Sequence, residues 1–189
     1  MRDNFLRSTR LVSGSHMTET STTLAYASLV LSSLVRFALT IADLNGLDIL
    51  SSDIQNSYLT SECQLKIWTR AGLECGSESG TTIIFRMTLY GLKSSGTAFC
   101  AHSAETLNAI GFISTKAEPV VWHLPAVKTN GFDYYKYNLC YVNDILCISH
   151  YPGIALEWIQ AVFKLKWDKM EQLKIYLGDQ VKNMIVDGA

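Results

Sequence analysis

Two acidic residues at the ends of predicted strands are the positions of this sequence that could do chemistry. Asp53 ends the run LDILSSDI (47–54), and Asp144 follows Asn143 in LCYVNDILCI (139–148), where the pair is expected to form the turn of a hairpin. If these strands are neighbours in a sheet, both carboxylates project from one edge. They could then share two Mg²⁺ ions about 3.5–4 Å apart for phosphoryl transfer. A strand-end Asp is common, however, and Asn-Asp is ordinary turn chemistry, so these positions alone favour a structural role.

The elements that must position these carboxylates follow from local patterns of the sequence. Apolar residues at helical spacing, among them Leu34, Ala38 and Ile41, predict a helix that stops at Asn45-Gly46. Apolar or alternating runs predict strands at 9–14, 47–54, 64–69, 81–88, 119–124, 134–142, 145–149 and 173–181. Further helices are expected at 97–110 and 153–167. This order indicates an α+β fold, an antiparallel sheet backed by helices.

The composition is typical of a folded protein, and the overall charge is close to zero. The 189 residues are 48% hydrophobic and 17% charged with a net charge of -1, so disorder is not expected and any basic surface must be local. The cysteines show no CxxC spacing and no His cluster joins them, which argues against zinc and for buried thiols in a reducing compartment. The stretch MRDNFLRSTR lacks the apolar core of a signal peptide, and Arg36 makes 24–44 a poor membrane span. We therefore expect no membrane partner.

Several short motifs resemble, in order and approximate spacing, the reverse transcriptase of copia-type LTR retrotransposons. They are TRLVSGSHMT, LDILSSDIQNSYLT, KIWTRAGLECG, LYGLKSSGTAF, YVNDIL and IYLG. The resemblance implies an RNA-directed DNA polymerase that binds an RNA or DNA template–primer and a dNTP, with two Mg²⁺ ions. It also implies a polymerase palm-type sheet with a partial fingers subdomain.

The resemblance assigns roles to the residues around the expected turn. Asp53 matches the first catalytic aspartate and Asp144 the second Asp of the family's Tyr-x-Asp-Asp motif, so both would be metal ligands. Tyr141 completes the motif and would help to place the primer end. Asn143 stands where the family has its essential aspartate of the pair. Because an amide oxygen is a neutral, weaker ligand for a hard dication, we expect weak or absent nucleotidyl transfer.

Three further positions match residues that bind the nucleotide in this family. Tyr58 matches the aromatic residue that lies under the deoxyribose and excludes a 2′-hydroxyl; the alternative is an ordinary strand Tyr packed on the core. Arg10 matches a basic residue that reaches the triphosphate, where a guanidinium binds phosphate in a bidentate manner; the alternative is a solvated charge on an edge strand. Lys93, in the turn before the predicted helix at 97–110, would contact phosphate or simply face solvent.

The resemblance covers nearly the whole chain, which we expect to be one fingers–palm fragment over 1–189. Residues 1–46 and about 64–90 would be fingers-like, and 47–63 and about 91–189 palm-like. Nothing in the sequence resembles a thumb, RNase H or integrase region, so processive synthesis by these residues alone is not expected. The family acts in cytoplasmic particles, whereas the sequence itself fixes no compartment. The alternatives are a non-catalytic nucleic-acid- or protein-binding remnant, or a translated fossil without a selected role.

Overall fold

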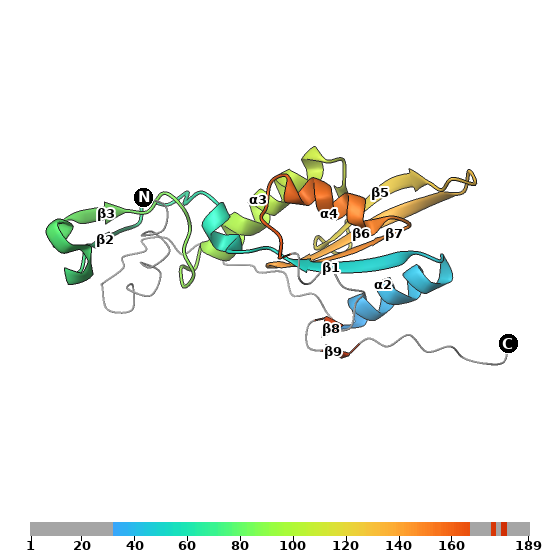
Figure 1. Cartoon of the computed structure of the whole chain (residues 1–189), viewed down its shortest axis with the longest axis horizontal. Coiled ribbons are helices and arrows are strands. Elements are labelled where there is room, and N and C mark those ends of the chain that lie inside the picture. Colours follow the sequence, from blue (N-terminus) through green and yellow to red (C-terminus); the bar gives the residue numbers. More distant parts are fainter. Residues whose placement is uncertain (1–31, 167–174, 177–178, 181–189) are drawn as a thin grey trace. The chain divides into compact units, whose positions relative to one another are not determined.

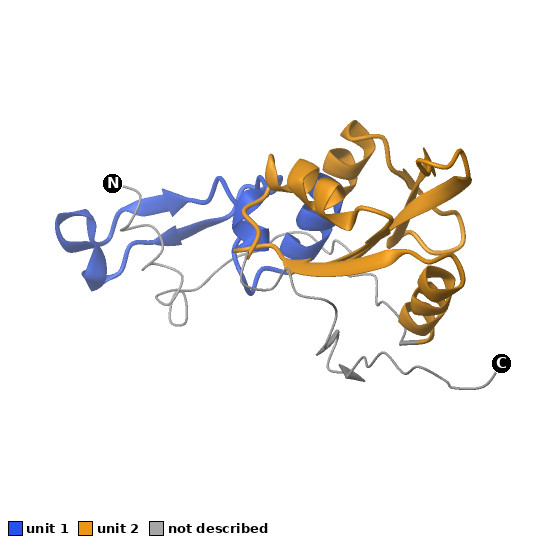
Figure 2. Ribbon diagram, turned by 45° about the vertical axis from the view of Figure 1, so that its right-hand side comes forward, with its two compact units in different colours: residues 1–27, 56–102 blue, residues 28–55, 103–189 orange. Residues whose placement is uncertain are grey.

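The computed structural model describes residues 32–166, 175–176 and 179–180 (Figure 1). The chain divides into two compact units, which Figure 2 shows in different colours. We call Ser28–Gln55 with Ser103–Ala189 the sheet unit, and Met1–Ala27 with Asn56–His102 the hairpin unit. Arg10 and the strand predicted at 9–14 lie outside the described residues.

A five-stranded antiparallel sheet forms the centre of the sheet unit, as predicted for an α+β fold. Its spatial order is β1-β7-β6-β5-β4. The strands are β1 (Asp48–Asp53), β4 (Ile113–Ser114), β5 (Val121–Val127), β6 (Asp133–Tyr141) and β7 (Asp144–Ser149). In β7 every residue after Asp144 is buried. The apolar run of this strand is therefore covered on both faces, as expected for a strand inside the sheet.

Helix α2 (Ser32–Leu44) packs on one face of the sheet through an apolar stripe. Val35, Ala38 and Ala42 form this stripe and are buried against the strands. The helix ends where the sequence predicts, because Gly46 takes a positive φ of 56°. The amide of Gly46 donates to Asp43 O (3.1 Å) and that of Leu47 to Ala42 O (2.8 Å), the bonding pattern of a Schellman cap.

Helix α4 (Pro152–Gln160) lies on the opposite side of the sheet from α2 (Figure 1). It buries Ala155, Leu156 and Ile159. The helix predicted at 153–167 is thus too long, since α4 ends at Gln160. Over residues 163–166 the chain alternates buried and more exposed side chains and pairs with the end of β1.

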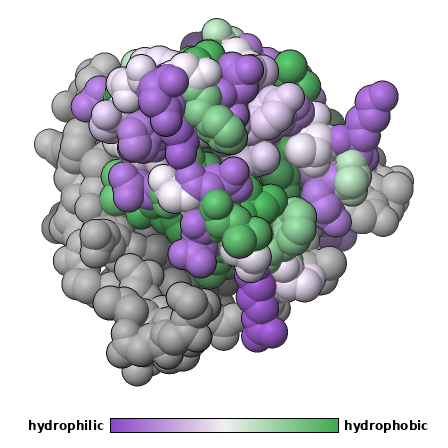
Figure 3. Space-filling model, turned by 90° about the vertical axis from the view of Figure 1, so that its right-hand side faces the viewer, coloured by the Kyte–Doolittle hydropathy of each residue, from purple (hydrophilic) through white to green (hydrophobic). Residues whose placement is uncertain are grey.

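The hairpin that joins β5 to β6 reaches the C-terminal end of α2. The ammonium group of Lys128 donates to Asn45 O at 2.7 Å and lies 5.8 Å from the centre of the Phe132 ring. Leu44, Val127 and Phe132 are exposed apolar residues of these elements. On the face of the molecule seen in Figure 3, apolar side chains gather between polar ones.

The hairpin unit contains two short paired strands, β2 (Trp68–Arg70) and β3 (Thr82–Ile84). The strands predicted at 64–69 and 81–88 therefore form a hairpin, but only three residues of each strand are regular. Its other elements in the part that the structure describes are the 3₁₀ helices η3 (Ser57–Thr60) and η4 (Leu73–Glu78) and the first part of α3 (Ser95–Ala109). Ile67, Leu89 and Leu92 form its small core.

The strand predicted at 173–181 is not one continuous strand. The structure describes two short antiparallel strands there, β8 (Ile175–Tyr176) and β9 (Asp179–Gln180), outside the five-stranded sheet. Across the described ranges, no helix is long and apolar enough to cross a membrane.

Candidate active site at the ends of β1 and β7

Val142 and Asn143 form the tight turn between β6 and β7. Tyr141 ends β6 and lies opposite Asp144, the first residue of β7. The prediction that Asp144 occupies the turn is therefore wrong. The register between β6 and β7, which pairs the buried residues of the two strands, makes Asp144 the first residue of β7. Val142 takes a positive φ of 50°. A β-branched residue rarely adopts this conformation, so the turn carries backbone strain.

Asp53 and Asp144 lie directly opposite each other on neighbouring strands. Their two strands are thus neighbours in the sheet, which is the condition under which both carboxylates lie at one edge. Tyr141 is the next residue across, so Asp53, Asp144 and Tyr141 form one row over β1, β7 and β6. Residues directly opposite in an antiparallel pair share a face of the sheet. The two carboxyl-bearing residues are therefore brought together by pairing alone.

Asn143 is held against β1 through its backbone. Its carbonyl oxygen accepts a hydrogen bond of 2.7 Å from the amide of Ile54, the residue that follows Asp53. The pairing of β1 with β7 thus continues into the turn. This bond fixes the backbone at position 143 beside both carboxyl-bearing residues, whichever side chain stands there.

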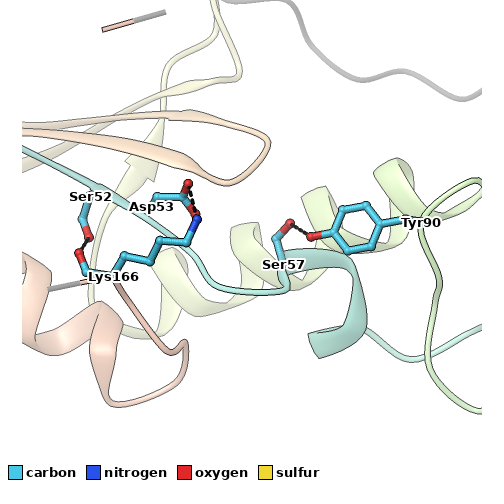
Figure 4. Close-up of polar contacts among 5 residues, drawn as sticks. All are labelled: Ser52, Asp53, Ser57, Tyr90 and Lys166. Atoms are coloured by element: carbon cyan, nitrogen blue, oxygen red, sulfur yellow. Dashed lines mark hydrogen bonds and ion pairs between the residues drawn. The ribbon is translucent and has the colours of Figure 1, made fainter. Parts of the chain in front are cut away.

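Lys166 is the functional-looking residue that sequence reasoning missed. Its ammonium nitrogen lies 2.8 Å from Asp53 Oδ2 (Figure 4). Its backbone amide donates to Asp53 O at 2.9 Å, and Ile54 forms an antiparallel bridge with Leu165. Lys166 therefore continues the row on the outer side of Asp53. The alternation Phe-Lys-Leu-Lys at 163–166 is typical of a strand and is the signal that identifies this segment, although the apolar pattern of 153–167 predicts a helix.

The electrostatics of the row are governed by this ion pair. Like charges directly opposite in a sheet repel, and an opposite charge on the adjoining segment offsets that repulsion. The side chain of Asp53 is 10% exposed and that of Lys166 is 39% exposed. Partial burial strengthens the attraction relative to an open surface pair, and the bond has the length of a charge-assisted hydrogen bond.

The residues do not fit a pair of Mg²⁺ ions. The donors are two carboxylates and, at position 143, a neutral amide, and one carboxylate is already engaged by an ammonium group. Two closely spaced dications need several shared negative ligands. Among the residues that the structure describes, no cluster of three or more His, Cys, Asp or Glu side chains could hold a metal ion.

The nucleotide-binding positions implied by the resemblance fall elsewhere in the chain. Tyr58 and Lys93 belong to the hairpin unit. Tyr58 lies in η3 rather than in a strand, and its ring centre is 4.7 Å from that of Tyr90 and 6.1 Å from that of Phe99. The hydroxyl groups of Ser57 and Tyr90 are 3.4 Å apart (Figure 4). Tyr58 is thus part of a small aromatic cluster with Tyr90 and Phe99.

Lys93 precedes α3, as predicted, and is exposed. Arg10 lies outside the described ranges.

All five cysteines are free thiols. Only Cys147 is buried, and Cys100 is exposed, so the prediction of buried thiols is wrong for Cys100. Burial raises the pKa of Cys147 well above its ordinary value, and Cys140 raises it further.

Comparison with known proteins adds no relative. No family model matches the chain, and neither a curated protein nor a solved structure matches it.

Proposed function

We propose that this chain is the fingers–palm portion of a copia-type reverse transcriptase, an RNA-directed DNA polymerase, with impaired nucleotidyl transfer. The motif order resembles that family across nearly all of the sequence. The observation that carries the proposal is the register that sets Asp53 opposite Asp144 beside the turn at Asn143. In a palm-type sheet this is the edge at which the primer end and the nucleotide would meet.

The reaction is attack of a primer 3′-hydroxyl oxygen on the α-phosphorus of a dNTP. A new phosphodiester bond forms and pyrophosphate leaves. This chemistry needs concentrated negative charge in the protein to hold the dications that neutralise the phosphates. With Asn143 in place of an aspartate, the chain presents one carboxylate fewer, and a rate loss of about 10³-fold, equal to about 4 kcal/mol, is expected.

Primer extension on an RNA template tests the proposal. The native chain is compared with Asn143→Asp and with the double variant Asn143→Asp/Asp53→Asn. Asn130→Asp is a matched control, since it makes the same change of charge in the turn between β5 and β6. We expect Asn143→Asp to raise extension by about 10³-fold, Asn130→Asp to leave it unchanged, and the double variant to be silent. A folded Asn143→Asp protein that is no more active than the native chain would contradict the proposal.

A non-catalytic binding role is the second candidate. The Asp53–Lys166 ion pair favours it, because it balances a carboxylate of the row without a metal ion. Binding of template–primer should then persist after removal of divalent cations and weaken steeply with salt. Binding that requires Mg²⁺ would count against this candidate.

A further inference from the structure

We propose that the ammonium group of Lys166 is the resident cation of the Asp53–Asp144 row and excludes divalent cations from it. The oxygen donors of this row do not match the needs of a pair of Mg²⁺ ions, and one of them already binds an ammonium group. Asp53 is buried, with 7% of its surface exposed, and its Oδ2 atom has the Lys166 ammonium at 2.8 Å. A dication that bound Asp53 through this oxygen would have to displace the ammonium group.

The backbone holds Lys166 in place for this role. Antiparallel bonding runs on both sides of the Ile54–Leu165 bridge, from Lys166 N to Asp53 O (2.9 Å) and from Gln55 N to Lys164 O (2.8 Å). The hydroxyl of Ser52 also reaches Lys166 O at 3.5 Å. The ammonium group is therefore tethered beside Asp53 at a high effective concentration, whereas a free ion must be drawn from solution.

The loss of a carboxylate at position 143 changes the competition between the two kinds of cation. Mg²⁺ dehydrates reluctantly and needs several negative oxygen ligands to offset that cost. An ammonium group carries a single charge on a side chain that is already fixed. With Asn143 contributing no charge, the lysine is the better match for the row. The inference concerns the site of the proposed function and rests on it for the expectation that a divalent cation would otherwise bind there.

Binding of Mn²⁺, a spectroscopic probe for the Mg²⁺ position, tests the inference without template, primer or nucleotide. Free Mn²⁺ is followed by electron paramagnetic resonance, and the thermal midpoint is measured with and without the ion. The proteins are the native chain, Lys166→Met, and Lys166→Gln in case the first variant does not fold. Lys164→Met is the matched control, because this exposed neighbour has its carbonyl in the same ladder.

We expect Lys166→Met and Lys166→Gln to bind Mn²⁺ about tenfold more tightly than the native chain, and Lys164→Met to bind as the native chain does. At the same Mn²⁺ concentration, the rise in midpoint should be larger in the Lys166 variants than in the native chain or in Lys164→Met. Addition of Asp53→Asn to Lys166→Met should remove the gain, which would place the ion at the row.

Two other results would overturn the inference, and they are distinguishable. Equal Mn²⁺ affinity of the native chain and the Lys166 variants, lost in Asp53→Asn, would show that Lys166 does not exclude the ion. That result would leave the proposed function standing, because the row would then be a metal site. Folded Lys166 variants that bind no Mn²⁺, even with Asn143→Asp added, would show that the free row holds no dication for Lys166 to exclude. The inference would then fail, and primer extension by Asn143→Asp would decide the proposed function separately.

Discussion

Asp53 and Asp144 lie directly opposite each other at the ends of β1 and β7, and Lys166 lies on the other side of Asp53. Two like charges in adjacent positions of a sheet raise the free energy of the fold. The cation on the third segment offsets that cost. The charges that balance one another in this row therefore come from three separate segments of the sequence: β1, β7 and the segment that contains Lys166.

This arrangement predicts a coupling between Asp53 and Lys166 in stability. Asp53→Asn should lower the free energy of unfolding by about 1–2 kcal/mol, because it leaves a half-buried ammonium group beside a neutral amide. Lys166→Met should cost less after Asp53→Asn than in the native chain. Since more than a third of the lysine side chain is exposed, we expect a coupling free energy of only about 0.5–1 kcal/mol.

A double-mutant cycle by urea denaturation measures that coupling. Asp133→Asn at the exposed start of β6 is the control, and its cycle with Lys166→Met should give a value near zero. The same coupling in both cycles would mean that the Asp53–Lys166 ion pair contributes nothing specific.

The elements with strong local signals could be predicted from the sequence. The helix ending at Gly46, the strand ending at Asp53 and the strands around the turn all follow from short-range patterns. Their apolar residues repeat at the spacing of the element that forms, and Gly46 supplies the left-handed residue of the cap. The pairing of β1 with β7 joins strands far apart in the chain, so local patterns leave it open.

The features that local patterns of the sequence do not predict depend on contacts between distant segments. Asn-Asp is better turn chemistry than Val-Asn, yet the register of the buried rows places Val142 in the turn and Asp144 in the strand. Residues 163–166 continue the apolar character of α4, so a single helix was the simpler prediction. This segment is extended because it pairs with the outer edge of β1. That pairing brings Lys166 into contact with Asp53.

The strained turn makes a prediction for Val142. Val142→Gly should raise the free energy of unfolding by about 0.5–2 kcal/mol, because glycine adopts positive φ without a Cβ clash and this gain exceeds its entropic cost in the unfolded chain. Val142→Ala keeps a Cβ atom and is the control, with a smaller effect or none. Chemical denaturation compares the three proteins, and a loss of stability in Val142→Gly would contradict the strain argument.

At Gly46, in the cap of α2, we expect the opposite effect: replacing the glycine should destabilise the fold. Gly46→Ala should lower the free energy of unfolding by about 1–2 kcal/mol, since the cap requires the left-handed conformation at this position. A Cβ atom at Gly153 in α4 would also meet open space, but that glycine has no positive φ, so Gly153→Ala should be neutral or stabilising. Equal effects of the two substitutions in thermal denaturation would exclude the capping explanation.

The buried thiol of Cys147 makes stability depend on pH in the alkaline range. Burial holds the pKa of the folded thiol well above its ordinary value of 9.0, whereas the unfolded chain ionises near that value. Above it, the unfolded state therefore binds fewer protons than the folded state, and stability falls as pH rises. Below it both states keep the proton and the thiol has no effect. The native chain should lose up to about 1.4 kcal/mol for each further pH unit through this group.

Comparison with Cys147→Ala isolates that contribution. The substitution costs stability at every pH because it leaves a cavity beside Asn138, whose side chain bonds the thiol. The difference between the two proteins should nevertheless shrink as the pH rises above the ordinary thiol value, because only the native chain carries the penalty of keeping Cys147 protonated. Alkylation provides an independent check, since Cys147 should react only after unfolding while the exposed Cys100 reacts in the folded protein. A constant difference across this range, together with modification of Cys147 in the folded state, would show that the thiol is not enclosed by the sheet.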